Sequence, residues 1–268
     1  MRPYRMAAAL AATGAMALAT AMGFEMLDTL PLEDRSQHQV VLGAAQKAYN
    51  RQVQETFGLA EGIDPDKWFQ VNLAAKANVN LFGGGGKTTP VSYPHMEVGR
   101  RVFYGVPFDV LDPKDNDKRT AIALPSSRLF PNELAPSVTV DVGRKAAVLY
   151  FLHTTWYTRK EEGQSYTFHY DDGSDFKVDF IGHVHCGDWW SPPARVYTED
   201  VRHVLAPAAK GSKTFHRNMH VMQWRNPSPE KKIRSITFTS NPEAQMAIFV
   251  VAVTGHPGPL AAEKARPK

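Results

Sequence analysis

The pattern of apolar and polar positions divides the chain into three stretches. An uncharged, Ala-rich run covers residues 6–22. Apolar residues then recur at every fourth position: Val41, Ala45, Tyr49, Val53 and Phe57. This spacing predicts one amphipathic helix, a helical spacer within residues 23–65. From Trp68 onward, short runs of alternating apolar and polar residues are separated by turn residues, which is typical of β-strands.

The strand-like runs predict an all-β domain over residues 66–255. Residues 137–142 alternate, and the alternating runs 166–170 and 176–180 are joined by Asp-Asp-Gly-Ser. Residues 146–152 are apolar throughout, which predicts a central strand covered on both faces. Further runs with strand character are 102–110, 120–124, 215–224, 233–239 and 246–253. About nine or ten short strands predict an antiparallel β-sandwich or jelly roll, followed by a frayed basic tail at 256–268.

Residues 1–22 have the organisation of an export signal. Arg2 and Arg5 precede the apolar run, and Ala19-Thr-Ala21 has the small-x-small form of a signal-peptidase site. The run is also at the short limit for spanning a bilayer. Two alternatives therefore stay open, a cleaved signal peptide and an uncleaved signal anchor that tethers the protein through residues 6–22. Both place the bulk of the chain outside the cytoplasm, in the periplasm or the extracellular space.

Charge and cysteine content narrow the classes of function. The net charge is +4 at pH 7, and without residues 1–21 it falls by two, to +2, because only Arg2 and Arg5 are lost. This net positive charge is too small to favour nucleic acid as a partner. The sole cysteine, Cys186, excludes an internal disulfide, so we expect the exported domain to rely on its apolar core.

The segment 183–190, His-Val-His-Cys-Gly-Asp-Trp-Trp, carries groups for several kinds of site. Alternation along residues 176–180 places Phe176, Val178 and Phe180 on the inward face. If the strand continues in this way, the Cys186 thiol points into the core with them, whereas His183 and His185 face outward. Two imidazoles at i and i+2 fit a metal ion only if a further ligand joins them, and no spacing in the sequence identifies one. His183 and His185 are therefore metal candidates that lack a defined third ligand.

A second acidic segment suggests calcium. Asp112, Asp115 and Asp117 are clustered in the sequence Asp-Pro-Lys-Asp-Asn-Asp, and hard cations prefer such carboxylates. The segment lacks the Gly at the sixth position and the distal Glu of a helix-loop-helix calcium site. A solvated turn is the favoured interpretation, and a structural calcium ion is the alternative.

Asp188, Trp189 and Trp190 follow the predicted strand, where a sandwich displays its loops. Two successive Trp side chains cannot both point inward in an extended segment. With Trp156 and Tyr157 at the end of another strand, the rings predict a ligand site that stacks on a sugar, while Asp188 accepts hydroxyl hydrogen bonds. The alternative is that these rings close the end of the core.

Several ordered motifs resemble one known type of module. They occupy residues 105–113, 116–124, 142–146 with 149–153, 188–190 and 224–231. The set is similar to a galactose-binding-like jelly-roll module of secreted bacterial proteins, often found beside glycoside hydrolases, and it covers about residues 66–255. The resemblance implies a jelly-roll architecture and a carbohydrate-binding function, and its motifs mark the fold more than a ligand site. The chain departs from the usual context, in which a catalytic domain accompanies the module.

We therefore expect a noncatalytic, extracytoplasmic, lectin-like binding module, with a glycan as its partner. One alternative is a membrane-anchored structural or accessory subunit of a larger envelope protein complex. A second is a metal-dependent hydrolase, which needs paired carboxylates or a metal with an open position, and the sequence shows neither convincingly. Apart from the calcium alternative, no cofactor is expected.

Overall fold

The computed structural model describes residues 65–82, 93, 96–159, 163–190, 201–207 and 216–258. These belong to the second of two compact units, residues 52–268. The predicted leader at 1–22, the spacer up to residue 64 and the tail beyond residue 258 lie outside the described residues. No helix in the described part of the chain is long and apolar enough to cross a membrane.

The described part is all-β, as the alternating runs predict. A single short 3-10 turn, η2 (Pro65–Lys67), precedes the strands among the described residues. The strands are β1 (Phe69–Val71), β2 (Gly99–Phe103), β3 (Val106–Val110), β4 (Ile122–Leu124), β5 (Ser137–Lys145), β6 (Val148–Trp156), β7 (Ser165–Tyr170), β8 (Asp175–Asp179), β9 (Val201–Pro207), β10 (His216–Arg225), β11 (Lys232–Thr239) and β12 (Ala247–His256).

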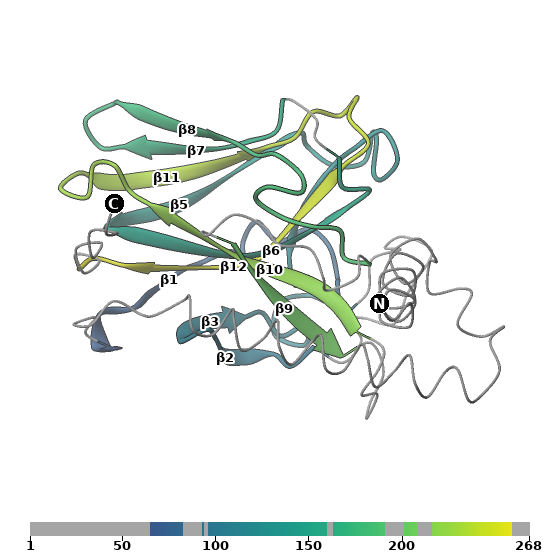
Figure 1. Cartoon of the computed structure of the whole chain (residues 1–268), viewed down its shortest axis with the longest axis horizontal. Coiled ribbons are helices and arrows are strands. Elements are labelled where there is room, and N and C mark those ends of the chain that lie inside the picture. Colours follow the sequence, from purple (N-terminus) through teal and green to yellow (C-terminus); the bar gives the residue numbers. More distant parts are fainter. Residues whose placement is uncertain are drawn as a thin grey trace, which may run out of the picture. The chain divides into compact units, whose positions relative to one another are not determined.

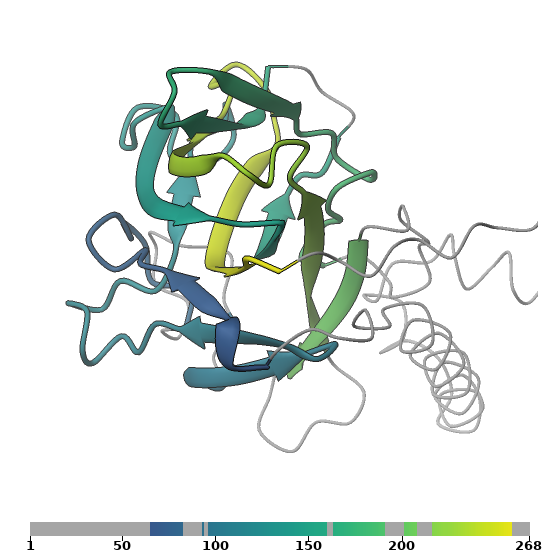
Figure 2. The same ribbon diagram turned by 90° about the vertical axis from the view of Figure 1, so that its left-hand side faces the viewer.

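Antiparallel pairing joins these strands into three sheets (Figure 1). The central sheet has the order β1-β12-β6-β10-β9, and β4 also pairs with β12. A four-stranded sheet has the order β5-β11-β7-β8, and β2 and β3 form a separate hairpin. Figures 1 and 2 show the central sheet lying between the four-stranded sheet and the β2–β3 hairpin. The result is a sandwich-like arrangement with the central sheet covered on both faces.

The sequence of β6 explains why it occupies the middle of the central sheet. Its side chains alternate between two apolar clusters: Leu149 and Phe151 belong to one, whereas Val148, Tyr150 and Leu152 belong to the other. β12 is buried along its whole length. A strand buried on both faces must be apolar at successive positions. The prediction of a central strand is therefore confirmed for residues 148–152, whereas Ala146 and Ala147 precede the strand.

Aromatic side chains fill the space between the central and the four-stranded sheet. The ring centroid of Phe151 lies 5.2 Å from Tyr166, 6.1 Å from Phe168 and 6.3 Å from Phe238. The Phe168 ring also stacks on Trp224. The edge-to-face contacts of Phe151 with Phe168 and Phe238 add to the free energy gained by burying the rings.

The four-stranded sheet ends at β8, which is less buried than its sequence suggests. Phe176 was expected on the inward face with Val178 and Phe180, but its side chain is 38% exposed. It lies at the rim of the core, with its ring centroid 5.9 Å from that of Trp224. β8 pairs only with β7 in this sheet, so a residue at its outer end has core on one side and solvent on the other.

We predict that Gly255→Ala destabilises the domain. Gly255 pairs directly with Phe69, and a Cβ added at Gly255 would lie 2.2 Å from the Phe69 ring. The ring must shift, at a cost of about 1–3 kcal/mol in the free energy of unfolding. Urea denaturation measures this cost. Val102→Ala is the control, because Val102 is 63% exposed on β2 and should change stability by less than about 0.5 kcal/mol. Equal stability of the two variants would contradict the prediction.

Candidate functional site

The chain turns sharply after β8 instead of continuing as a strand. Between residues 181 and 186, the His183 N–H donates to the Cys186 carbonyl at 2.7 Å, and the His185 N–H donates to the Ile181 carbonyl at 3.0 Å. The Ile181 N–H in turn donates to His185 Nδ1 at 2.9 Å. His183 has a positive φ of 65°. The predicted strand continuation through residue 186 is therefore wrong.

Gly182 allows this turn to pass close to the end of β6. A Cβ at this position would lie 2.1 Å from the Arg159 carbonyl oxygen and 2.8 Å from Met246 Sδ. Only glycine fits without a backbone shift. The turn delivers the following segment to β6, where Asp188 forms a parallel bridge with Thr155.

Cys186 is fully buried, as predicted, although the turn rather than strand alternation carries it inward. Its Sγ lies 3.4 Å from His220 Nδ1 and 3.4 Å from the Gly187 carbonyl oxygen. Burial raises the pKa of the thiol well above its usual value, because the thiolate would lose its hydration. The neutral thiol is a small core group.

The candidate metal ligands do not come together. The described residues hold no group of three or more His, Cys, Asp or Glu side chains that could bind a metal ion. His185 accepts a hydrogen bond from its own loop, and burial lowers its pKa. Asp112 accepts from the Lys114 N–H at 2.8 Å, and Asp117 lies 3.5 Å from Arg119. Asp112, Asp115 and Asp117 thus lie in a turn between β3 and β4.

Asp188 fixes the loop to the end of β6 through its carboxylate. Oδ1 accepts a hydrogen bond from the Trp190 N–H at 2.9 Å, and Oδ2 accepts from the Thr158 N–H at 3.2 Å. The Trp189 N–H donates to the Thr155 carbonyl at 2.9 Å. Both carboxylate oxygens therefore hold the backbone on which the two tryptophans are displayed.

The two tryptophans divide between core and surface. Trp189 is 9% exposed and packs in the apolar cluster with its ring centroid 6.4 Å from Tyr93. Trp190 is 40% exposed, and its ring meets Trp189 edge to face at 5.2 Å. One tryptophan points inward and the other outward, as expected, although both lie in a turn instead of an extended segment.

Arg217, near the start of β10, lies against both indole rings. Its Cζ is 3.7 Å from the Trp190 ring centroid and 4.6 Å from that of Trp189. Desolvation lowers the pKa of the guanidinium, and the ring faces supply favourable electrostatics for its charge. Asn218 also connects β10 to the segment that carries the tryptophans, since its N–H donates to the Trp189 carbonyl at 2.8 Å. Sequence reasoning missed Arg217, because no local pattern pairs a residue of β10 with the tryptophans.

Trp156 and Tyr157 lie at the same end of β6. Their ring centroids are 4.8 Å apart, and Trp156 packs partly buried against the core. The Arg128 guanidinium lies 5.0 Å from the Tyr157 ring centroid, and Arg159 Nη1 donates to the Thr158 carbonyl at 3.2 Å. The hydrogen bond from Thr158 to Asp188 links these residues to the tryptophans. We call this set the arginine–aromatic cluster: Arg128, Trp156, Tyr157, Arg159, Trp189, Trp190 and Arg217.

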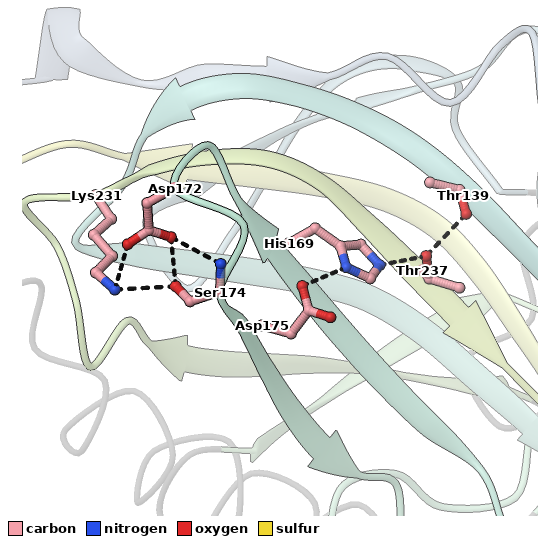
Figure 3. A network of polar contacts seen from close by, with 7 residues as sticks. All are labelled: Thr139, His169, Asp172, Ser174, Asp175, Lys231 and Thr237. Carbon is pink, nitrogen blue, oxygen red and sulfur yellow. Dashed lines mark hydrogen bonds and ion pairs between the residues drawn. The ribbon is translucent and has the colours of Figure 1, made fainter.

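A separate polar network crosses the four-stranded sheet (Figure 3). His169 Nδ1 lies 2.7 Å from Asp175 Oδ1, and His169 Nε2 lies 2.8 Å from Thr237 Oγ1. Thr237 Oγ1 is 2.8 Å from Thr139 Oγ1. Hydroxyl, imidazole and carboxylate groups bonded in this order also occur in active sites, where the imidazole activates the hydroxyl as a nucleophile. Here the four residues come from four neighbouring strands, so the contacts act as cross-strand pairs that fix the sheet.

Comparison of this chain with models of protein families, with curated proteins and with solved structures finds no match.

We predict that His153 makes the domain less stable in acid. His153 is fully buried, with Nε2 donating to the His185 carbonyl and Nδ1 accepting from the Tyr166 hydroxyl. Desolvation lowers its pKa from 6.5 to about 3. Below pH 6.5 the unfolded chain binds a proton that the folded chain does not, so this contribution to stability is complete above pH 6.5 and falls towards pH 3. The loss is about 1.4 kcal/mol per pH unit, or about 2 kcal/mol at pH 5.

Urea denaturation of the wild type and of His153→Gln at pH 7 and pH 5 tests this prediction. The variant is expected to have lower stability at pH 7 and a smaller loss between the two pH values. The same loss in both proteins would show that another group carries the acid sensitivity.

We predict that Cys186 resists thiol reagents in the folded protein, since its thiol is buried and its pKa is raised. Ellman's reagent at pH 8 should react with one thiol only after urea is added, at the rate of unfolding. Rapid modification without denaturant would mean that the turn at Gly182 opens readily.

Proposed function

We propose that this chain is a noncatalytic binding module that acts outside the cytoplasm and binds carbohydrate at the arginine–aromatic cluster. The observation that carries the proposal is the partial exposure of Trp190, 40% of its surface, on a backbone held by Asp188. Sugar rings present apolar faces with hydroxyl groups around their rims. An exposed indole beside polar donors is complementary to both features.

The rigidity of the cluster supports a binding role. The hydrogen bonds of Asp188 fix the Trp190 backbone, and the edge-to-face contact with Trp189 fixes the relation of the two rings. A side chain that is already ordered loses little conformational entropy when a ligand binds. Trp190 is thus preorganised as a contact surface, while Trp189 serves as its anchor in the core.

The side chains of Arg217 and Arg128 supply hydrogen-bond donors next to the rings. Arg217 lies on Trp190, Arg128 lies on Tyr157, and Arg159 contacts the Thr158 carbonyl. Each guanidinium has several N–H donors that suit sugar hydroxyls and ring oxygens. The cluster therefore combines apolar surface with directional polar contacts.

We further propose that the sandwich-like fold is a jelly roll of the galactose-binding-like type. In support, the ordered motifs coincide with structural elements: residues 149–153 lie in β6, residues 122–124 form β4, and Trp224 lies in β10. The leader sequence supports export, with the module either released or tethered through residues 6–22. A carbohydrate ligand fits a module of this architecture and location.

Replacing Trp190 and Trp189 separately tests the proposal. The full chain is first screened on a glycan array, and the affinity for the best ligand is then measured by calorimetry. Trp190→Ala is expected to cost about 1–3 kcal/mol of binding with little change in melting temperature, because a partly exposed ring is lost. Trp189→Ala is expected to cost about 3–5 kcal/mol of folding stability, because it leaves a cavity in the core.

Phe176→Ala is the matched control, since Phe176 has similar exposure but lies at the rim of the four-stranded sheet. This variant should bind glycan like the wild type. The proposal fails if no glycan binds, or if Trp190→Ala retains full affinity. The accessory role in an envelope protein complex would then replace it.

A further inference from the structure

Building on the proposed function, we propose that the ligand is an acidic glycan, a polysaccharide that carries carboxylate or sulfate groups, and that Arg217 binds its anionic group. The juxtaposition that carries this inference is a guanidinium held on two indole rings at the same end of the sheet as two further arginines.

The two indole rings hold the Arg217 guanidinium in position. At 3.7 Å from the Trp190 centroid, the guanidinium is close enough to contact the ring through its face. The N–H groups of a guanidinium lie in its plane, so a face contact directs them away from the ring. Planar, immobilised guanidinium groups suit the two oxygens of a carboxylate or sulfate group. A lysine at this position would lack both the stacking and the fork of donors.

The cluster carries more positive than negative charge. Its arginines, Arg128, Arg159 and Arg217, lie with one carboxylate, that of Asp188, which keeps its negative charge while it accepts hydrogen bonds from backbone N–H groups. Partial burial of Arg217 also lowers the pKa of its guanidinium, because desolvation disfavours the charged form. An anionic group bound beside the guanidinium would offset this penalty.

An acidic sugar gains more from this arrangement than a neutral one. Charge-assisted hydrogen bonds are about twice as strong as those between neutral groups. A neutral sugar can still stack on Trp190, so it should bind, but more weakly. The expected preference for the acidic form is about 10-fold or more.

The test compares glycans that differ only in charge. Binding of the full chain to polygalacturonate is measured against its fully methyl-esterified form, and binding to dextran sulfate against dextran. The first pair detects recognition of carboxylate, and the second detects recognition of sulfate. In at least one pair the acidic form should bind about 10-fold more tightly, and its affinity should fall as the salt concentration rises.

Variants separate Arg217 from general electrostatic attraction. Arg217→Gln should weaken binding of the acidic glycan about 10-fold, and Arg217→Lys should recover only part of this loss. Arg234→Gln removes the same charge from an exposed position on β11 and should change affinity less than about twofold. Both Arg217 variants should weaken binding of the neutral glycan less than binding of the acidic glycan, because a neutral sugar has no charge to pair with the guanidinium. Arg234→Gln should change neither affinity by more than about twofold.

Four results would overturn the inference. Equal binding of acidic and neutral forms would leave the carbohydrate proposal standing and remove the role of charge. An equal effect of Arg234→Gln would show nonspecific attraction instead of a site at Arg217. Tighter binding to phosphatidylglycerol vesicles than to either acidic glycan would identify an anionic membrane surface as the ligand. If no glycan binds at all, the proposed function fails together with this inference.

Discussion

The burial of β6 and β12 on both faces is the constraint on which the rest of the structure depends. Each face of the central sheet is apolar and must be shielded from water. The four-stranded sheet covers one face, and the β2–β3 hairpin covers the other. Polar groups within these strands must then find partners inside the protein. Thr154 Oγ1 donates to the Asn218 carbonyl, and Thr155 Oγ1 donates to the Gly187 carbonyl.

These internal hydrogen bonds shape the candidate site. The bonds of Thr155, with those of Thr158, draw the segment 187–190 along the end of β6. Trp189 and Trp190 then lie in a turn held by Asp188, with the Trp189 side chain in the core and the Trp190 side chain facing outward. The surface on which a ligand could stack is therefore a direct result of how the central sheet satisfies its own polar groups.

The periodicity of apolar residues predicted the strands, which depend on local alternation of side chains. It missed the turn and the arginine contact, which depend on residues far apart in the sequence. The apolar run at 146–152 indicated a strand with two covered faces, and this is how β6 is built. The strand continuation past Phe180 was wrong, because the turn depends on how closely Gly182 approaches the Arg159 carbonyl. The burial of Cys186 was predicted correctly for a different reason. Arg217 was missed because its contact with Trp190 joins two segments that no sequence pattern relates.

The pairing of the first and last described strands has a consequence for how the domain is presented to its surroundings. Phe69 of β1 pairs with Gly255 of β12, and His256 pairs with Val148, at the beginning of β6. The arginine–aromatic cluster lies beside Trp156, at the opposite end of that strand. The first residues of β1 and the last residues of β12 thus lie at the end of the central sheet opposite the cluster. A ligand that occupies the cluster would therefore reach the domain without contacting either end of its described chain.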